Sequence, residues 1–283
     1  MVALERDVVP RGPYRMPRAG RDGVLRRRKG DRALVRLIHH GDEQAVVSAR
    51  PCGGAVRIRA EAESRVAAAY AIDRMRFALG VDHDLRPFQR RFRTDPLIGP
   101  VIRRRPWLRP GRIADPFQAL AWAITEQLIE VERAEAIQRR LVWRYGRVSV
   151  CGQWRDAPSA AQLAGRAPAE LEGCDLAGKR AIAMVRAGHE VASGRADLEQ
   201  HEPAWQRLLK IREIGPWTIE KLAFFGQGRD DMLPAGDLAY IKGVGGLAGL
   251  GRRATVDEVR EFFAPYAPYE ALAGVYALAR AYL

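Results

Sequence analysis

The sequence predicts an α+β protein in which a small antiparallel sheet with helices precedes a larger all-helical domain. Three observations carry this prediction. Short runs rich in branched residues lie between residues 32 and 60, a helical pattern takes over at residue 62, and no strand pattern follows residue 113. A run of strands followed by a run of helices is typical of α+β architectures.

The strands are expected at residues 32–39, 44–48 and 55–60, where branched or alternating apolar residues occur. Glycines at positions 41, 53 and 54 supply the turns. A helix is expected over residues 62–79, ending at Gly80. The first 23 residues are rich in Arg, Gly and Pro and are predicted to be a flexible basic arm. The N-terminal α+β domain then covers residues 24–112.

The helical domain is expected over residues 113–283. Asp115 followed by Pro116 is a typical helix start, because the carboxylate accepts hydrogen bonds from free N–H groups. Thr255 and Glu258 have the spacing of a capping box. Helical segments are predicted at residues 115–146 with a break near 130, at 178–193, 203–210, 216–226 and 255–264, and from about 268 to the end.

Composition excludes several classes of protein. The chain has 283 residues, 47% apolar and 29% charged, which is globular usage and excludes global disorder. No apolar run reaches 18 residues and the start lacks an apolar signal core, so neither a membrane span nor secretion is expected. The three cysteines are far apart, so no metal site is assigned. We expect a cytoplasmic, monomeric protein.

The net charge of +13 is concentrated in two blocks. Residues 1–30 carry +6 and residues 86–112 carry +8, so the remainder is nearly neutral. Genome composition bias is an alternative explanation, since the chain has 42 arginines and 5 lysines. Such a bias would spread arginine evenly, whereas a concentrated basic surface indicates a polyanionic partner, most commonly nucleic acid.

Residues 208–220, LLKIREIGPWTIE, form a candidate phosphate-binding segment. They predict a short helix, a tight turn at Ile214-Gly215 and a second helix that opens with Pro216. Glycine permits the positive φ that such a turn often needs. Free N–H groups at the start of the second helix suit a phosphate. An ordinary corner between two helices would show the same pattern.

Asp237 lies 22 residues after Gly215, in the segment LPAGDLAYIK at residues 233–242. This pair of segments resembles the helix-hairpin-helix (HhH-GPD) DNA glycosylases, and within them the AlkA-type DNA-3-methyladenine glycosylases. Residues 115–128 are similar to the first helix of that catalytic domain, and residues 79–84 with 107–110 to its junction with the N-terminal domain. The resemblance covers residues 24–283 and implies an HhH-GPD domain with its hairpin at 208–220.

The resemblance places Asp237 at the catalytic position. Cleavage of an N-glycosidic bond builds positive charge on the sugar, which a fixed carboxylate stabilises while it orients the attacking water. A role only as N-cap of the following helix is the alternative for Asp237. Trp217 occupies the slot where bifunctional relatives have a lysine nucleophile, which implies a monofunctional enzyme without lyase activity.

Further residues match positions that contact the flipped nucleotide. Trp217, Tyr269 and Gln127 are assigned to the base pocket, where aromatic faces attract a positively charged alkylated purine. Leu128 matches the wedge that fills the gap left by the flipped nucleotide. Core packing is the alternative for Trp217, Tyr269 and Leu128.

The resemblance implies double-stranded DNA as partner. Contacts with its backbone are assigned to Ile214, Gly215, Trp217, Thr218, Arg103, Arg104 and Arg105. No cofactor is implied beyond a monovalent cation that hairpin carbonyls can hold. No iron–sulfur cluster is expected, because the four C-terminal cysteines of the iron–sulfur relatives are absent.

The chain departs from the family pattern at three places. Arg212 and Glu213 replace Pro-Gly, Lys221 and Leu222 replace an aromatic pair, and Glu270 and Ala271 replace Arg-Ser. The implied function is removal of alkylated, 3-methyladenine-like purines from duplex DNA by hydrolysis, in base excision repair. The alternative is a non-catalytic protein of this fold that binds damaged or bent DNA.

Overall fold

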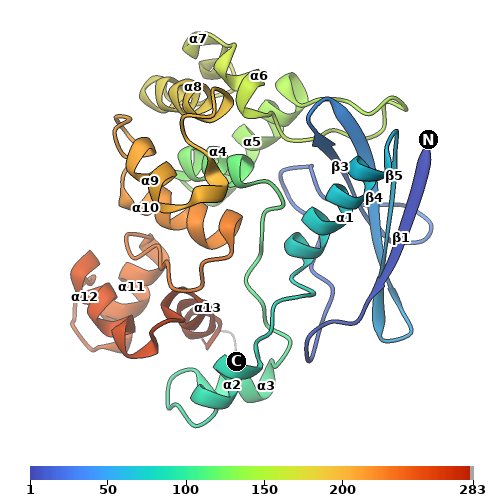
Figure 1. Cartoon of the computed structure of the whole chain (residues 1–283). Coiled ribbons are helices and arrows are strands. Elements are labelled where there is room, and N and C mark those ends of the chain that lie inside the picture. The colour runs from blue at the N-terminus through green and yellow to red at the C-terminus, as the bar shows by residue number, and fades with distance from the viewer. Residues whose placement is uncertain (281–283) are drawn as a thin grey trace.

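The computed structural model describes residues 1–280 and confirms the predicted α+β architecture. Figure 1 shows a sheet with one long helix on one side of the molecule and a larger body of helices on the other. The buried apolar residues form three clusters: one between the sheet and its helix, and two within the helical body. The last three residues of the predicted C-terminal helix lie outside the described part of the chain.

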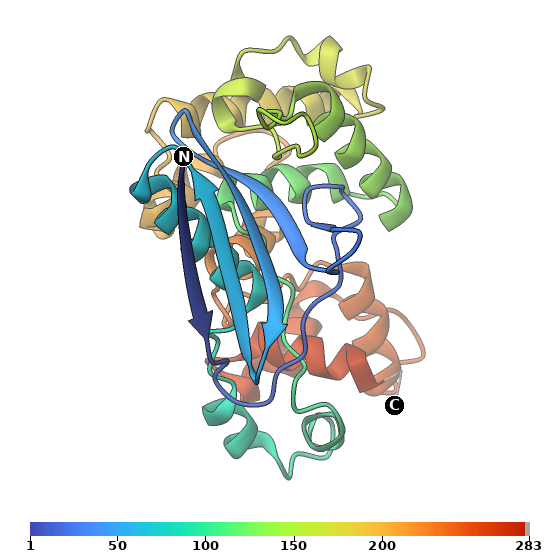
Figure 2. The ribbon, with the colours of Figure 1, turned by 90° about the vertical axis from the view of Figure 1, so that its right-hand side faces the viewer.

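The sheet has the strand order β1-β5-β4-β3-β2, with antiparallel neighbours throughout. Helix α1, Arg65–Leu79, starts at the N-cap Ser64 and ends at Gly80 in the left-handed conformation. It packs on one face of the sheet, and Figure 2 shows the opposite face without a covering helix. The strands are β1 Val2–Val8, β2 Arg26–Arg27, β3 Leu34–His40, β4 Glu43–Cys52 and β5 Ala55–Ala62.

The prediction of a flexible arm over residues 1–23 is wrong, because the start of the chain is an edge strand. Strand β1 pairs with β5 from Val2 opposite Ala62 to Val8 opposite Val56. Its charged residues follow one another at positions 5–7 and are exposed, and Arg57 of β5 donates to the Asp7 carboxylate at 2.7 Å. The charges that suggested an arm therefore face solvent and pair across the strands, as is common at a sheet edge.

Residues 85–102, predicted as part of the N-terminal domain, share a hydrophobic cluster with the C-terminal helices. They form α2, Arg86–Phe92, and α3, Gly99–Arg104, and α3 packs against α13, Glu270–Arg280. These short helices contain proline and several arginines, so the sequence shows no clear helical apolar pattern there. Phe88 and Ile98 are nevertheless fully buried. The boundary at residue 112 therefore does not separate two cores.

The remaining helices build the body of the helical domain. The predicted break near residue 130 lies between α4 and α5, and Asp115 caps α4 as expected, accepting from the Phe117 N–H at 2.7 Å. Thr255 and Glu258 form the predicted capping box. The segments are α4 Pro116–Glu126, α5 Val131–Tyr145, α6 Ala160–Ala164, α7 Pro168–Glu172, α8 Gly178–Ala192, η1 Leu198–Gln200, α9 Glu202–Leu208, α10 Pro216–Lys221, the π-helical turn η2 Leu222–Gly226, α11 Leu238–Leu247, α12 Val256–Phe263 and η3 Ala264–Tyr266.

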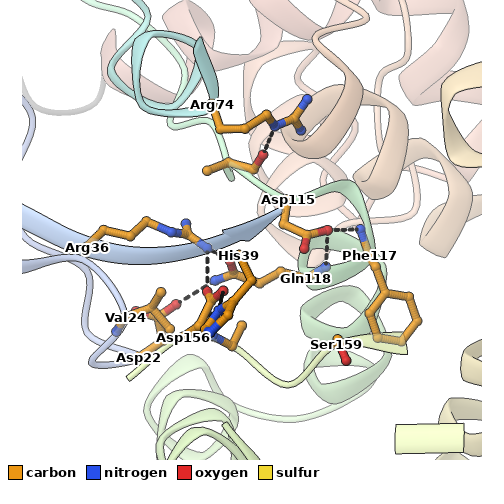
Figure 3. Close-up of polar contacts among 12 residues, drawn as sticks. Asp22, Val24, Arg36, His39, Arg74, Asp115, Phe117, Gln118, Asp156 and Ser159 are labelled. Atoms are coloured by element: carbon orange, nitrogen blue, oxygen red, sulfur yellow. Dashed lines mark hydrogen bonds and ion pairs between the residues drawn. The ribbon is translucent and has the colours of Figure 1, made fainter. Parts of the chain in front are cut away.

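A buried polar cluster joins the sheet to the helical body (Figure 3). From β3, Arg36 donates to Gln118 at 2.7 Å and to Asp156 at 3.3 Å. The His39 Nδ1 atom lies 3.0 Å from the same Asp156 carboxylate. Gln118 in turn donates to Asp22 at 3.0 Å, which fixes the chain that follows β1. The sheet and the helices are thus tied together by charged groups removed from water.

Candidate active site and DNA-binding surface

The predicted hairpin consists of α9, α10 and the turn between them. Gly215 is the N-cap of α10 and is extended, with φ −109° and ψ −177°. The expectation that this glycine supplies a positive φ is therefore wrong. The left-handed residue is Glu213, with φ +76°, where the family resemblance expects glycine. Such a conformation costs a non-glycine residue on the order of 1–3 kcal/mol.

Leu128 projects from the loop between α4 and α5. Its relative exposure is 104%, and its φ is +52°. A fully exposed leucine contributes no buried apolar area to folding, and the left-handed backbone adds a cost. Core packing, the alternative for this residue, is therefore not what the structure shows.

The loop that presents Leu128 is fastened to the hairpin. The Gln127 side-chain amide donates to the Glu213 carbonyl at 2.7 Å and to the Thr218 hydroxyl at 3.0 Å. Arg180 of α8 donates to the Gln127 carbonyl at 2.9 Å. Both amide hydrogens of Gln127 are used in this way, so its nitrogen is not free for a base. These contacts support a positioning role for Gln127, and its assignment to the base pocket stays a prediction.

Asp237 is half-buried at the start of α11. Its Oδ1 atom accepts a hydrogen bond from the Ala239 N–H at 3.0 Å, so it is an N-cap, as its alternative role required. Within residues 1–280, its Oδ2 atom has no hydrogen-bond partner. Trp217 packs beside the preceding residue, since a Cβ placed on Gly236 would lie 3.4 Å from Trp217 Cδ1. The hairpin helix and the aspartate are therefore neighbours.

The loop that leads to Asp237 is held by a buried ion pair. The Arg112 guanidinium donates to Asp230 at 2.5 Å, and His83 Nε2 lies 2.8 Å from the same carboxylate. Burial opposes ionisation of Asp230, but the hydrogen bonds and charges of His83 and Arg112 hold the pKa of its carboxyl below the usual value. The Asp230 carbonyl also accepts from the Ala271 N–H at 2.9 Å. The base of the loop is thus joined to the start of α13.

A lysine lies beside Trp217. The Lys221 ammonium forms an ion pair with Glu126, at the end of α4. Its Nζ atom is 5.0 Å from the centroid of the Trp217 ring and 5.3 Å from that of Phe225. Gln138 donates to the other oxygen of Glu126 at 3.2 Å. The sequence marks Lys221 as a departure from the family pattern, and a charged residue at the end of an apolar helix is the signal that points to Glu126.

Trp217 has a polar atom that folding leaves unpaired. Its indole N–H is buried and has no hydrogen-bond partner among the described residues. An unpaired buried donor costs about 1–3 kcal/mol. Packing alone would be served better by a phenylalanine, so the structure gives no packing reason for an indole at this position.

Tyr269 lies in an aromatic cluster with Phe88 and Phe92. Its ring centroid is 5.6 Å from that of Phe88 and 6.5 Å from that of Phe92, with edge-to-face geometry. Within residues 1–280, no ring contact joins Tyr269 to Trp217. The structure therefore favours the alternative of core packing over a place in the base pocket.

The arginines assigned to the DNA backbone lie at the end of α3. Arg103 and Arg104 are exposed, and Arg105 is half-buried. Arg103 donates to the Arg93 carbonyl at 2.6 Å, which leaves its other guanidinium nitrogens available. Figure 1 places α3 at the bottom of the molecule, below α13, whereas the hairpin helices α9 and α10 lie higher, above α13. The two assigned surfaces are thus separate parts of the molecule.

A cavity of about 290 Å³ lies between the chain after β1 and the start of the helical body. Asp22, Gln118, Trp122, Glu126 and Gln138 are among its lining residues, whereas Asp237, Trp217 and Tyr269 are not. Glu126 therefore reaches both this cavity and Lys221. Across residues 1–280, no cluster of three or more His, Cys, Asp or Glu side chains could hold a metal ion, and no helix is long and apolar enough to cross a membrane.

The chain is similar to known repair enzymes. It is 27% identical over 206 residues to the DNA-3-methyladenine glycosylase of Bacillus subtilis. The matched region covers 69% of this chain and 67% of that protein. The structure of the 3-methyladenine DNA glycosylase from Archaeoglobus fulgidus matches with a TM-score of 0.75 at 21% identity, over 88% of each chain. No family model matches the chain.

A second structure was solved with DNA. The Schizosaccharomyces pombe 3-methyladenine DNA glycosylase in complex with abasic DNA matches with a TM-score of 0.53 at 26% identity, over 62% of this chain and 86% of that one. In sequence and in fold, the chain is thus similar to the DNA-3-methyladenine glycosylases.

Proposed function

We propose that this protein is a monofunctional DNA glycosylase that removes alkylated, 3-methyladenine-like purines from duplex DNA in base excision repair. The observation that carries the proposal is Leu128, fully exposed at φ +52° on a loop fastened to the hairpin. An exposed apolar side chain held in one place suits insertion into a base stack, where it replaces a flipped nucleotide. Such a residue has no role in the folded protein alone.

Asp237 acts in this proposal on the sugar of the flipped nucleotide. Its Oδ1 atom is fixed by the Ala239 N–H, which leaves Oδ2 to face the reacting centre. As the bond from C1′ to the base nitrogen breaks, the electron pair leaves with the base and positive charge develops at C1′. The carboxylate stabilises that charge and accepts a proton from the water that attacks C1′.

Base release from methylated duplex DNA tests the proposal. The protein is incubated with DNA treated with a methylating agent, and the released bases are separated by chromatography. Release of 3-methyladenine is expected from the wild type and not from Asp237→Asn. Binding of the methylated duplex without release of any base would instead establish the alternative, a non-catalytic binding protein.

A second assay tests the absence of lyase activity. Trp217 stands in the slot of the lysine nucleophile, and the nearby Lys221 amine is bound to Glu126. A free amine is needed to form a Schiff base with C1′. We expect no strand cleavage without added base or heat and no covalent adduct after borohydride reduction. A trapped adduct that disappears in Lys221→Met would show lyase activity from this lysine.

A further inference from the structure

Lys221 brings a positive charge to the face of Trp217, the ring that packs beside Gly236, the residue before Asp237. Its Nζ atom lies 5.0 Å from the Trp217 ring and 5.3 Å from the Phe225 ring. The Lys221 side chain is 15% exposed and that of Glu126 is 29% exposed, so the pair lies at the edge of the interior, within reach of a ligand. Glu126 fixes the ammonium in place without removing it from the two ring faces.

A ring that already faces an ammonium attracts a second cation less well. Cation–π attraction draws a positively charged alkylated base to an electron-rich ring, and here the same face of Trp217 serves Lys221. A positively charged base that approached this ring would also meet the like charge of Lys221. The arrangement therefore disfavours cationic bases compared with a site that has only aromatic residues.

For a neutral base, the Lys221 ammonium is favourable rather than repulsive. When a neutral purine leaves, the electron pair of the broken bond makes the departing base anionic, whereas a cationic alkylated base departs as a neutral molecule. An ammonium that donates a hydrogen bond to the departing base stabilises the charge that develops in the transition state. Neutral lesions need this assistance more than cationic ones do.

We propose that Lys221 is a specificity-determining residue, held by Glu126 beside Trp217, that shifts the enzyme from cationic alkylated purines toward neutral purine lesions. This inference rests on the proposed glycosylase function. In the reaction, water adds its oxygen to C1′ and gives its proton to Asp237. The base leaves with the bonding electron pair while Lys221 donates a hydrogen bond to it.

Two matched duplexes test this role. One carries a single 7-methylguanine, which is cationic, and the other a single hypoxanthine, which is neutral, in the same sequence. Single-turnover release is measured for the wild type, Lys221→Met, Lys221→Arg and Glu126→Gln. The control is Lys29→Met, which removes an exposed lysine in the turn between β2 and β3.

The quantity compared is the ratio of hypoxanthine release to 7-methylguanine release, since a general loss of folding lowers both rates alike. We expect Lys221→Met to lower this ratio by about tenfold or more, which corresponds to about 1.4 kcal/mol in transition-state free energy. Lys221→Arg keeps the charge and is expected to retain most of the ratio, Glu126→Gln to lower it less than Lys221→Met, and Lys29→Met to leave it unchanged.

An unchanged ratio in Lys221→Met overturns the inference. A wild type that releases methylated bases but no hypoxanthine also overturns it, while the proposed function stands. A wild type that releases neither base, nor any base from methylated DNA, overturns the proposed function itself.

Discussion

The side-chain amide of Gln127 donates a hydrogen bond to the hydroxyl of Thr218 at 3.0 Å, which ties the loop carrying Leu128 to helix α10. The same amide donates to the Glu213 carbonyl in the hairpin turn. The proposed wedge Leu128 and the hairpin that is proposed to bind phosphate are therefore positioned relative to one another by one residue. Such pre-organisation avoids the entropy cost of ordering the loop when DNA binds.

Replacement of Leu128 by alanine is expected to slow base release from duplex DNA without lowering thermal stability. The side chain is fully exposed, so its loss removes no buried area. Loss of about 1.4 kcal/mol of support for the flipped state would slow release by tenfold. Val150→Ala, which shortens another exposed aliphatic residue, serves as the control. A normal rate for Leu128→Ala would rule out the wedge.

Asp237→Asn is expected to abolish base release while DNA affinity stays within a few-fold of the wild type. The asparagine oxygen can still accept from the Ala239 N–H, so the helix cap is preserved and only the charge is lost. Groups that act only in the transition state typically contribute on the order of 10²–10³ in rate. Single-turnover release and a binding titration measure the two effects. Normal excision would leave Asp237 with the capping role alone.

Glu213→Gly is expected to tighten binding to undamaged duplex several-fold at low salt. Glu213 lies in the hairpin turn, before the N–H groups proposed to hold a phosphate, and repulsion by its carboxylate is least screened at low ionic strength. Its contact with the largely exposed Arg212 guanidinium, at 3.7 Å, offsets little of this repulsion. Glycine also accepts φ +76° without strain, so the melting temperature is expected to rise.

Glu213→Gln separates the two effects, because glutamine removes the charge but keeps the strained backbone. It is expected to tighten binding as glycine does and to leave the melting temperature unchanged. Titrations at two salt concentrations and a thermal melt give both quantities. Equal affinity of wild type and Glu213→Gly at the lower salt would show that the carboxylate does not face the phosphate.

Replacing Arg103, Arg104 and Arg105 together by alanine is expected to flatten the salt dependence of DNA binding. Each phosphate contact adds about 0.9 to the slope of log affinity against log salt. The matched control is the triple change at Arg140, Arg166 and Arg195, which lie outside both basic blocks and pair with Asp175, Glu170 and Glu190. An unaltered slope after the first change would mean that α3 faces away from DNA.

Local chemistry made much of the fold predictable. The caps at Asp115 and Thr255 depend on residues within a few positions, and so their helices begin where the sequence predicts. Strand β1 was missed because its partner lies about fifty residues away and its charges mimic a loose segment. Helices α2 and α3 were missed because, within them, proline and arginine outnumber the apolar residues.

The candidate site was likewise predictable only where short sequence motifs mark its residues. The resemblance led to Asp237, Trp217 and Leu128, which the structure places beside the hairpin or in full contact with solvent. Tyr269 and Gln127 differ because their surroundings depend on tertiary contacts that no spacing reveals. The pairing of Lys221 with Glu126 joins helices 95 residues apart and likewise becomes visible only in the folded chain.

The position of β1 at the edge of the sheet sets an order for the assembly of the protein during synthesis. Strands β2 to β5 are consecutive neighbours in the sheet and can pair as soon as each has been made, whereas β1 must wait for β5. The closure of that long segment makes β1 the last strand to dock. Until then the edge of β5 is open, so this interval is when the nascent chain is most exposed to pairing with another chain.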